Sequence, residues 1–200
     1  MPKGFSENQK EKITKALIET GKVFFSQYGL KKTSIAELTK AVGISQGSFY
    51  LFFPSKEMLF YTVLKEEEVK IKAQLMEEVD FTSSDIKGNL KKIMFWTLDM
   101  AENNPFIKQM ISMNELDMLM SGVPKEISDE HMKKDGDFFM EIISKWQSDE
   151  RLVNIKTEVL VGVFGVVFTL PFNKKIIGED NYKQTIELVI DSLAEGLLRR

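Results

Sequence analysis

The 200-residue chain contains no cysteine, a single histidine and two tryptophans. Without cysteine, disulfide bonds and thiolate metal ligands are excluded, and nothing points to an oxidising compartment. One histidine cannot supply the ligand cluster of a zinc site. The N-terminus has no apolar signal region, and the longest apolar run, residues 159–172, is shorter than an ordinary membrane span. We therefore expect a cytoplasmic protein with no metal, no cofactor and no membrane partner.

Catalytic motifs are equally scarce. The chain has no nucleophile elbow, no P-loop and no glycine-rich dinucleotide turn. Its histidine, His131, lies among Asp129, Glu130, Lys133 and Lys134, where we expect the exposed start of a helix. No partner pattern singles out an acid–base pair among the carboxylates. The sequence predicts no catalytic residues and no enzyme activity.

What the chain does contain is apolar residues at helical spacing, within a composition that is 43% hydrophobic and 28% charged. Capping residues, glycines and prolines separate the periodic segments. About nine helices and an all-α fold are expected, with helices over residues 6–28, 34–42, 46–52, 55–79, 83–102, 105–120, 126–147, 152–170 and 181–198.

Residues 33–59 carry the most informative pattern. Ser34 and Glu37 have the spacing of a capping box, which predicts a helix start. Gly43 follows the apolar stripe of that helix at a position where helices often end in a left-handed residue. Ser45 can then cap a second helix. This is the pattern of a helix-turn-helix, although a small capped hairpin without a DNA-binding role would show the same signals.

The second helix of this pair suits contact with double-stranded DNA. Phe49 and Phe52 should point inward, which leaves Gln46, Gly47 and Ser48 at an exposed N-terminal end that can enter a major groove. Gln46 can make paired hydrogen bonds to adenine, Ser48 can bond a base edge or a phosphate, and Gly47 allows close approach. We therefore predict that this helix reads bases.

Other polar residues nearby are suited to phosphates, because hydroxyls, helix N-termini and lysines fix the register of a protein on DNA without reading sequence. Thr33, Ser45, Tyr50 and Lys56 are expected in this role. The complete set of predicted DNA-binding residues is Thr33, Ser34, Ser45, Gln46, Gly47, Ser48, Tyr50 and Lys56.

The charge of the chain is divided unevenly. Residues 1–56 hold nine Lys and four acidic residues, a balance of +5, so the remaining 144 residues carry −8 of the total −3. Basic charge at the predicted DNA end supplies salt-sensitive affinity.

The segment from about Glu11 to Leu59 closely resembles the DNA-binding domain of the tetracycline-repressor (TetR) family of bacterial regulators. The matching stretches are Phe24-Phe25, Tyr28-Gly29, Thr33-Ser34-Ile35, Ala41-Val42-Gly43-Ile44-Ser45, Gly47-Ser48-Phe49-Tyr50, Phe52-Phe53-Pro54-Ser55-Lys56-Glu57 and Leu59. The resemblance implies an all-helical homodimer that represses transcription until a small molecule binds its larger C-terminal domain.

By matching position, the resemblance implies recognition contacts for Gln46, Ser48 and Tyr50 and backbone contacts for Thr33, Ser45 and Lys56. Two residues depart from the family pattern: Phe49 replaces a smaller apolar residue, and Leu51 replaces a polar or aromatic one. We expect Leu51 to weaken one phosphate contact and to leave the scaffold intact.

Residues 1–54 are expected to form the helix-turn-helix domain and residues 55–200 a helical ligand-binding and dimerisation domain. The last two helices are more apolar than one packed face requires, and the family resemblance implies a four-helix bundle between two subunits that matches a palindromic operator. Intramolecular packing alone is the alternative. The predicted interface residues are Val159, Val163, Val166, Ile186, Val189, Ile190, Leu193 and Leu197.

The part between these regions is rich in aromatic residues and methionine, which suits varied hydrophobic ligands. Each residue alone is better explained as core. The predicted ligand-binding residues are Phe95, Trp96, Met100, Met110, Met113, Phe138, Phe139, Phe164 and Phe168. Asp99, Glu102, Glu115 or Asp117 could pair with a lipophilic cation, and a neutral or fatty-acid ligand fits equally well.

Three functions therefore remain open, led by a homodimeric repressor that a hydrophobic inducer releases from a palindromic operator. In the second, the C-terminal domain is only a dimerisation or protein-partner module. In the third, the chain binds a small molecule without contacting DNA. The sequence does not identify the operator, the inducer or the regulated genes, nor does it separate repression from activation.

Overall fold

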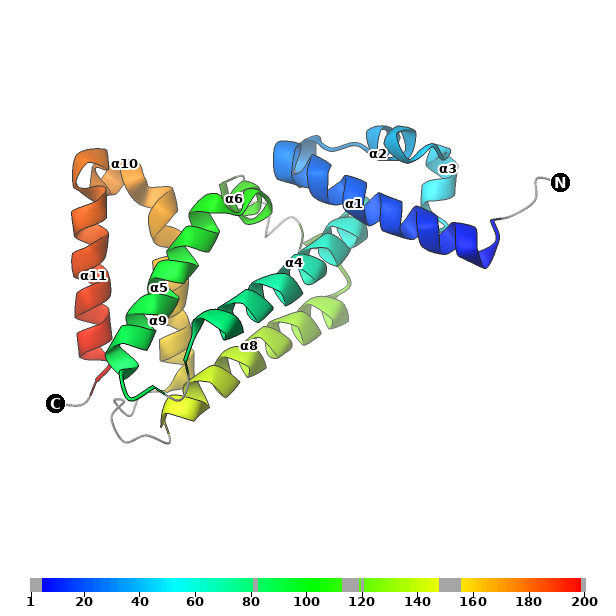
Figure 1. Cartoon of the computed structure of the whole chain (residues 1–200). Coiled ribbons are helices and arrows are strands. Elements are labelled where there is room, and N and C mark those ends of the chain that lie inside the picture. The colour runs from blue at the N-terminus through cyan, green and yellow to red at the C-terminus, as the bar shows by residue number, and fades with distance from the viewer. Residues whose placement is uncertain (1–4, 81–82, 113–118, 120, 148–155, 199–200) are drawn as a thin grey trace. The chain divides into compact units, whose positions relative to one another are not determined.

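The computed structural model describes residues 5–80, 83–112, 119, 121–147 and 156–198. Their elements are helices, so the predicted all-α fold is confirmed (Figure 1). The α-helices are α1 (Glu7–Lys32), α2 (Ile35–Val42), α3 (Gln46–Phe49), α4 (Lys56–Glu78), α5 (Ile86–Asn103), α6 (Pro105–Ser112), α8 (Lys125–Gln147), α9 (Thr157–Thr169), α10 (Lys174–Ile177) and α11 (Tyr182–Gly196), and the 3₁₀ helices are η1 (Leu170–Asn173) and η2 (Glu179–Asn181).

Several helix boundaries differ from the sequence-based prediction by a few residues, and two differences are larger. Residues 171–181, predicted as a break between helices, contain η1, α10 and η2. The first helix was expected to stop at Gly29, and this glycine does interrupt the helical backbone with φ 79°, a left-handed value that favours glycine. The residues after Gly29 are helical again, so α1 extends to Lys32.

The contacts divide the chain into two compact units. The first consists of residues 1–70 and 105–128, and the second of residues 71–104 and 129–200. The helix α4 contributes residues to both units, because the division falls between Lys70 and Ile71. The domain boundary after residue 54 stays a prediction.

The core of the first unit contains three neighbouring phenylalanines from three helices, with their rings tilted against one another. The ring centroid of Phe60 on α4 lies 4.9 Å from that of Phe25 on α1 and 4.9 Å from that of Phe106 on α6. All three side chains are fully buried, as are Leu17 and Leu59. Burial of such rings is a major stabilising term, and here it joins α1, α4 and α6.

A buried carboxylate connects α1 and α4 in the same unit. Lys22 donates a hydrogen bond to Glu67 over 2.6 Å, and Lys70 donates to the same oxygen over 2.9 Å. Burial, the largest influence, raises the pKa of Glu67, but the hydrogen bonds and charges of the two lysines together hold it below its ordinary value of 4.5. Glu67 is therefore ionised and paired at neutral pH.

We expect Glu67→Gln to destabilise the protein by roughly 1.5–3 kcal/mol at pH 7, the range for a hydrogen bond to a charged group. Because the folded-state pKa is lowered, the contribution of the carboxylate is complete above the unfolded-state pKa and is lost as the pH falls through the folded-state pKa. Urea unfolding at pH 7 and near pH 3 measures both effects. Glu66→Gln, at the exposed neighbouring position, should change stability little at either pH.

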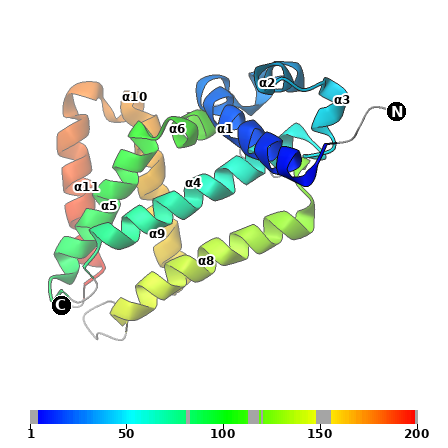
Figure 2. The same cartoon turned by 45° about the vertical axis from the view of Figure 1, so that its right-hand side comes forward.

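The core of the second unit lies between α5, α9 and α11, which run side by side in both views (Figures 1 and 2). Its buried side chains come from all three helices and include Leu90, Met94, Leu160, Phe164, Val167, Ile186 and Ile190. Lys91 of α5 also forms an ion pair of 2.5 Å with Asp191 of α11. Apolar packing supplies most of the stability here, because exposed ion pairs contribute little.

The segment Glu158–Ile177 is long and apolar enough, by length and composition alone, to cross a membrane. The run of residues 159–172, expected to be too short for a membrane span, lies inside this longer segment, of which 22% of the most apolar stretch is buried. A core helix of a soluble protein passes the same test. In the structure Leu160, Phe164 and Val167 are buried in the core of the second unit.

His131 corrects another expectation. The surrounding charges predicted an exposed histidine, but its side chain is only 5% exposed. The helix α8 turns this position inward and leaves Lys133 and Lys134 at the surface. The charged residues next to His131 in the sequence therefore do not indicate which face of α8 it lies on.

Candidate nucleic-acid interface

The helix α2 begins as its sequence predicts, with a capping box. The backbone N–H of Glu37 donates to the Ser34 hydroxyl over 3.2 Å, and the N–H of Ser34 donates to the Glu37 carboxylate over 3.0 Å. The Ser34 hydroxyl also donates to that carboxylate, and these bonds lower the pKa of Glu37. Ser34 is exposed, but its hydroxyl already serves as a cap.

The turn after α2 depends on Gly43, whose φ of 78° and ψ of 31° place it in the left-handed region. This conformation is easiest for glycine and lets the next N–H, from Ile44, donate back to Thr39 over 3.0 Å. Ser45 then caps α3 by accepting a hydrogen bond from the N–H of Ser48 over 3.1 Å. The predicted helix-turn-helix is thus present in the described residues.

The helix α3 has one buried and one exposed face. Phe49 is fully buried, its ring centroid lies 6.0 Å from that of the buried Phe53, and Phe52 is half-buried. The exposed face carries Gln46 and Gly47 at its start and Tyr50, 59% exposed, one turn further on. Three of the predicted DNA-binding residues therefore lie together on one open surface.

Two of the predicted phosphate contacts have roles inside the unit. Thr33 is 1% exposed, and its hydroxyl donates to the carbonyl oxygen of Gly29 over 2.7 Å. The Lys56 ammonium donates to the carbonyl oxygen of Thr33 over 2.6 Å. The Thr33 side chain thus faces the interior because it closes the end of α1, while the half-buried Lys56 joins the start of α4 to the residue that caps the end of α1.

The two serines of α3 are also linked. The hydroxyls of Ser45 and Ser48 lie 2.7 Å apart, and either can be the donor. Ser45 is exposed and Ser48 half-buried, so both retain access to solvent. A phosphate or base edge would compete with, or add to, this pair.

Leu51, an exposed residue of this surface, was not among the predicted DNA-binding residues. Leu51 is 72% exposed and follows Tyr50 on the same turn. Its spacing of four from Gly47 was available in the sequence and indicates a shared helical face.

The predicted interface residues divide into two groups. Ile186, Ile190 and Leu197 are buried in the core of the second unit, because α11 uses this stripe to pack on α5. Their part in an interface between two copies stays a prediction. Val159 and Val166 on α9 are exposed, Val163 and Leu193 are partly buried against the core, and Val189 is half-buried.

The predicted ligand-binding residues are distributed over both units. Phe164 is buried, Trp96 and Phe138 pack against the same core, Met100 and Phe168 are half-buried, and Phe95 is exposed, all in the second unit. Met110 is buried in the first unit. Met113 lies outside the described residues, and so does the side chain of Phe139.

The predicted acidic partners of a cationic ligand are placed as follows. Glu102 forms an ion pair of 2.8 Å with Lys174, so a charge within its own unit already matches it. Asp99 is exposed on α5 and accepts a hydrogen bond from Asn103. Glu115 and Asp117 lie outside the described residues.

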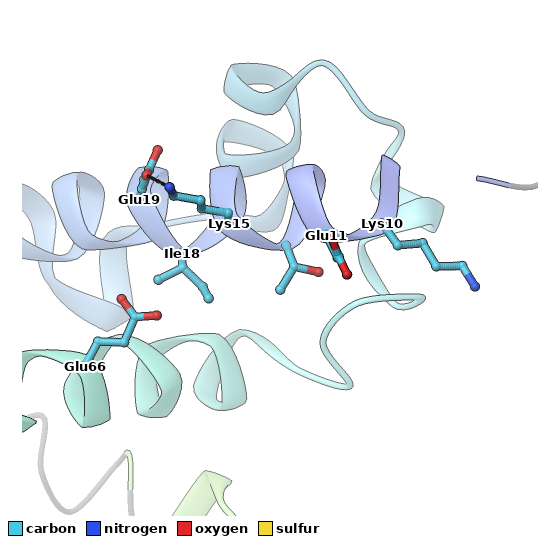
Figure 3. Close-up of a pocket in the computed structure, with 7 residues that line it drawn as sticks. Lys10, Glu11, Lys15, Ile18, Glu19 and Glu66 are labelled. Carbon is cyan, nitrogen blue, oxygen red and sulfur yellow. Dashed lines mark ion pairs between the residues drawn. The ribbon is translucent and has the colours of Figure 1, made fainter. Parts of the chain in front are cut away.

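A groove of about 480 Å³ lies in the first unit, between α1 and α4 (Figure 3). Charged side chains dominate its lining, including Lys15 and Glu19, which form an ion pair of 3.9 Å, and Glu66 from α4. None of the predicted ligand-binding residues lines it.

The geometry defines a protein with a helix-turn-helix whose second helix is open to a partner. Residues 17–63 match the family described as "Bacterial regulatory proteins, tetR family". The uncharacterised HTH-type transcriptional regulator YuxN of Bacillus subtilis (strain 168) is 47% identical over 56 residues, which are 28% of this chain and 18% of YuxN. The nucleoid occlusion factor SlmA of Glaesserella parasuis serovar 5 (strain SH0165) is 25% identical over 112 residues, which are 56% of this chain and 53% of SlmA.

A solved structure of a tetR-family transcription regulator from Shewanella sp. PV-4 has the same fold, with a TM-score of 0.69 and 19% identity over 94% of this chain and 99% of that one. The N-terminal part of the chain is therefore a tetR-family helix-turn-helix domain, and the chain has the fold of tetR-family regulators. Such regulators are DNA-binding proteins rather than enzymes, in agreement with the expectation from the sequence. The chain spans only about a fifth of YuxN and about half of SlmA.

Proposed function

We propose that the protein is a homodimeric DNA-binding transcriptional regulator. The observation that carries this proposal is the exposed face of α3, with Gln46, Gly47 and Tyr50 on a helix anchored by the buried Phe49, inside the segment that matches the tetR family. A helix presented in this way fits a major groove, and its polar groups suit base edges and phosphates. The +5 charge of residues 1–56 adds sequence-independent attraction to DNA.

The finer proposal is a cytoplasmic repressor that a hydrophobic small molecule releases from a palindromic operator. The ligand would favour an arrangement in which the two recognition helices of a dimer no longer match successive major grooves. The helix α4 would transmit the effect of the ligand to the helix-turn-helix, because it is one continuous helix with residues in both units. The predicted aromatic and methionine residues of the second unit are the proposed ligand contacts.

Titration of DNA flanking the protein's own gene, by gel shift at several salt concentrations, tests the DNA-binding proposal. We expect a specific complex whose affinity falls steeply with salt. Binding that is equal for flanking and unrelated DNA would count against a specific regulator. Release of the complex by hydrophobic compounds would support the inducer.

A second candidate rests on the match to SlmA, which extends over 112 residues and therefore well beyond the 47 positions of residues 17–63. In this alternative the protein binds DNA, but its C-terminal part serves a protein partner rather than a small molecule. Specific DNA binding that no hydrophobic compound weakens would favour it.

Gln46 and Lys56 should affect DNA binding in different ways. Gln46→Ala removes paired hydrogen bonds to a base and should relax sequence preference at one position per half-site, by about 1–3 kcal/mol. Lys56→Ala removes a positive charge and should weaken binding to all sequences and flatten the salt dependence. Affinity measurements on the specific site, on its single-base variants and on unrelated DNA separate the two. Equal effects of both substitutions on every sequence would refute these roles.

The dimer is proposed to use the exposed side of α9. Val159 and Val166 are exposed there, and a Cβ added at Gly162 or Gly165 would meet no side chain within 4 Å, so another helix can approach closely. Val166→Arg should convert a dimer to a monomer, as measured by light scattering at micromolar concentration. Ile176→Arg, at an exposed position on α10, is the matched control and should remain a dimer. A wild-type monomer would contradict the proposal.

A further inference from the structure

The apolar side chain of Leu51 is not packed in the core of the first unit. It is 72% exposed, although the aromatic residues on either side of it in sequence, Phe49 and Phe53, are buried. The core of the first unit therefore does not explain why this position is a leucine. An exposed leucine alone is ordinary, but this one lies beside the proposed base-reading residues.

The backbone places Leu51 on the same face as those residues. The N–H of Leu51 donates to the carbonyl oxygen of Ser48 over 3.1 Å, and the N–H of Phe53 donates to that of Phe49 over 3.1 Å. Tyr50 between them has right-handed helical angles, with φ −70° and ψ −7°. The turn therefore continues beyond α3 with hydrogen bonds that span three or four residues, so residues three and four apart are neighbours on its surface.

Two rows result from this spacing. Gln46 and Tyr50 form a polar row, and Gly47 and Leu51 form a second row beside it. A Cβ added at Gly47 would have no heavy atom within 4 Å, apart from its two chain neighbours and the nearby helix backbone. The surface over Gly47 is therefore open, and the exposed Leu51 follows it on the next turn.

We infer that Leu51 is a specificity-determining residue that packs against the C5-methyl group of a thymine in the operator, with Gly47 leaving the room for that base to approach. This inference rests on the proposed DNA-binding function. Leucine has no hydrogen-bonding group for a phosphate or a base edge. The thymine methyl is the apolar group that standard bases present in the major groove, so it is the base feature that an apolar side chain can select.

Single replacements of thymine by deoxyuridine test this contact, because they remove the methyl group and keep every hydrogen-bonding group of the base. The DNA is a site obtained by random-site selection with the wild-type protein. We expect one thymine per half-site at which deoxyuridine weakens wild-type binding about fourfold, the effect of losing one buried methyl group. Leu51→Ala should bind the unmodified site more weakly and should be insensitive to the same replacement.

Val23→Ala, at an exposed aliphatic position on α1 in the same unit, is the matched control and should respond to deoxyuridine as the wild type does. Leu51→Ala should keep the wild-type melting temperature, since its side chain is exposed. If every replacement changes wild-type and Leu51→Ala binding equally, the thymine contact is refuted while the DNA-binding function stands. If the wild type selects no specific site, the proposed function and this inference fail together.

Discussion

Phe60→Ala should destabilise the protein by about 3–5 kcal/mol, the range for removing a fully buried phenylalanine side chain. Phe60 is 1% exposed, and its ring lies between those of Phe25 and Phe106. The truncation would leave a cavity where α1, α4 and α6 meet, and the rings of Phe25 and Phe106 would lose their contacts with Phe60. Urea unfolding followed by circular dichroism measures the loss.

Two companion variants keep this prediction testable if Phe60→Ala does not accumulate in folded form. Phe60→Leu retains most of the apolar volume and should lose less than half as much stability. Tyr28→Ala removes an aromatic ring of the same unit from an exposed position and should change stability by less than about 1 kcal/mol. Similar losses for the buried and the exposed ring would contradict the proposed core of the first unit.

Gly47→Leu should lower affinity for the specific DNA site by about 100-fold or more without destabilising the protein. The glycine has a negative φ and open space around it, so the fold accepts a side chain. Leucine also has a higher helix propensity than glycine by somewhat less than 1 kcal/mol. On the DNA, however, the new side chain would occupy the room needed for close approach in both half-sites, where base contacts contribute about 1–3 kcal/mol each.

The comparison that isolates this effect is Gly47→Ala, which adds only a methyl group and should weaken binding to an intermediate extent. Fluorescence anisotropy on the selected site and thermal melting of the same samples give affinity and stability together. Wild-type affinity in Gly47→Leu would show that no DNA approaches this face of α3. A large fall in melting temperature would instead show that Gly47 has a packing role.

Local sequence signals predicted the helix-turn-helix well. The capping pair Ser34 and Glu37, the left-handed Gly43 and the cap at Ser45 each depend on neighbours within a few residues, and all are present in the structure. Such short-range interactions can be recognised from spacing alone. The exposed face of α3 follows from them once Phe49 is assigned to the interior.

Features that depend on distant parts of the chain were harder to predict. Thr33 appeared to be a surface hydroxyl, but Lys56, 23 positions later, closes over its carbonyl group. The charges around His131 suggested exposure, but the face that α8 buries is set by packing that the local sequence does not contain. The ion pair between Lys22 of α1 and Glu67 of α4 likewise joins two residues that are 45 positions apart in the sequence. Pairings of this kind depend on tertiary packing rather than on local pattern.

Selection from a pool of randomised duplex DNA, performed in parallel with the wild-type protein and with Gln46→Ala, tests the central claim most directly. We predict that the wild type enriches a pseudo-palindromic sequence whose half-sites are about one helical turn apart or a multiple of it. The Gln46→Ala protein should enrich a more degenerate version of that sequence. A wild-type selection that enriches no sequence above the starting pool, or an identical result for the two proteins, would contradict the claim that α3 reads DNA.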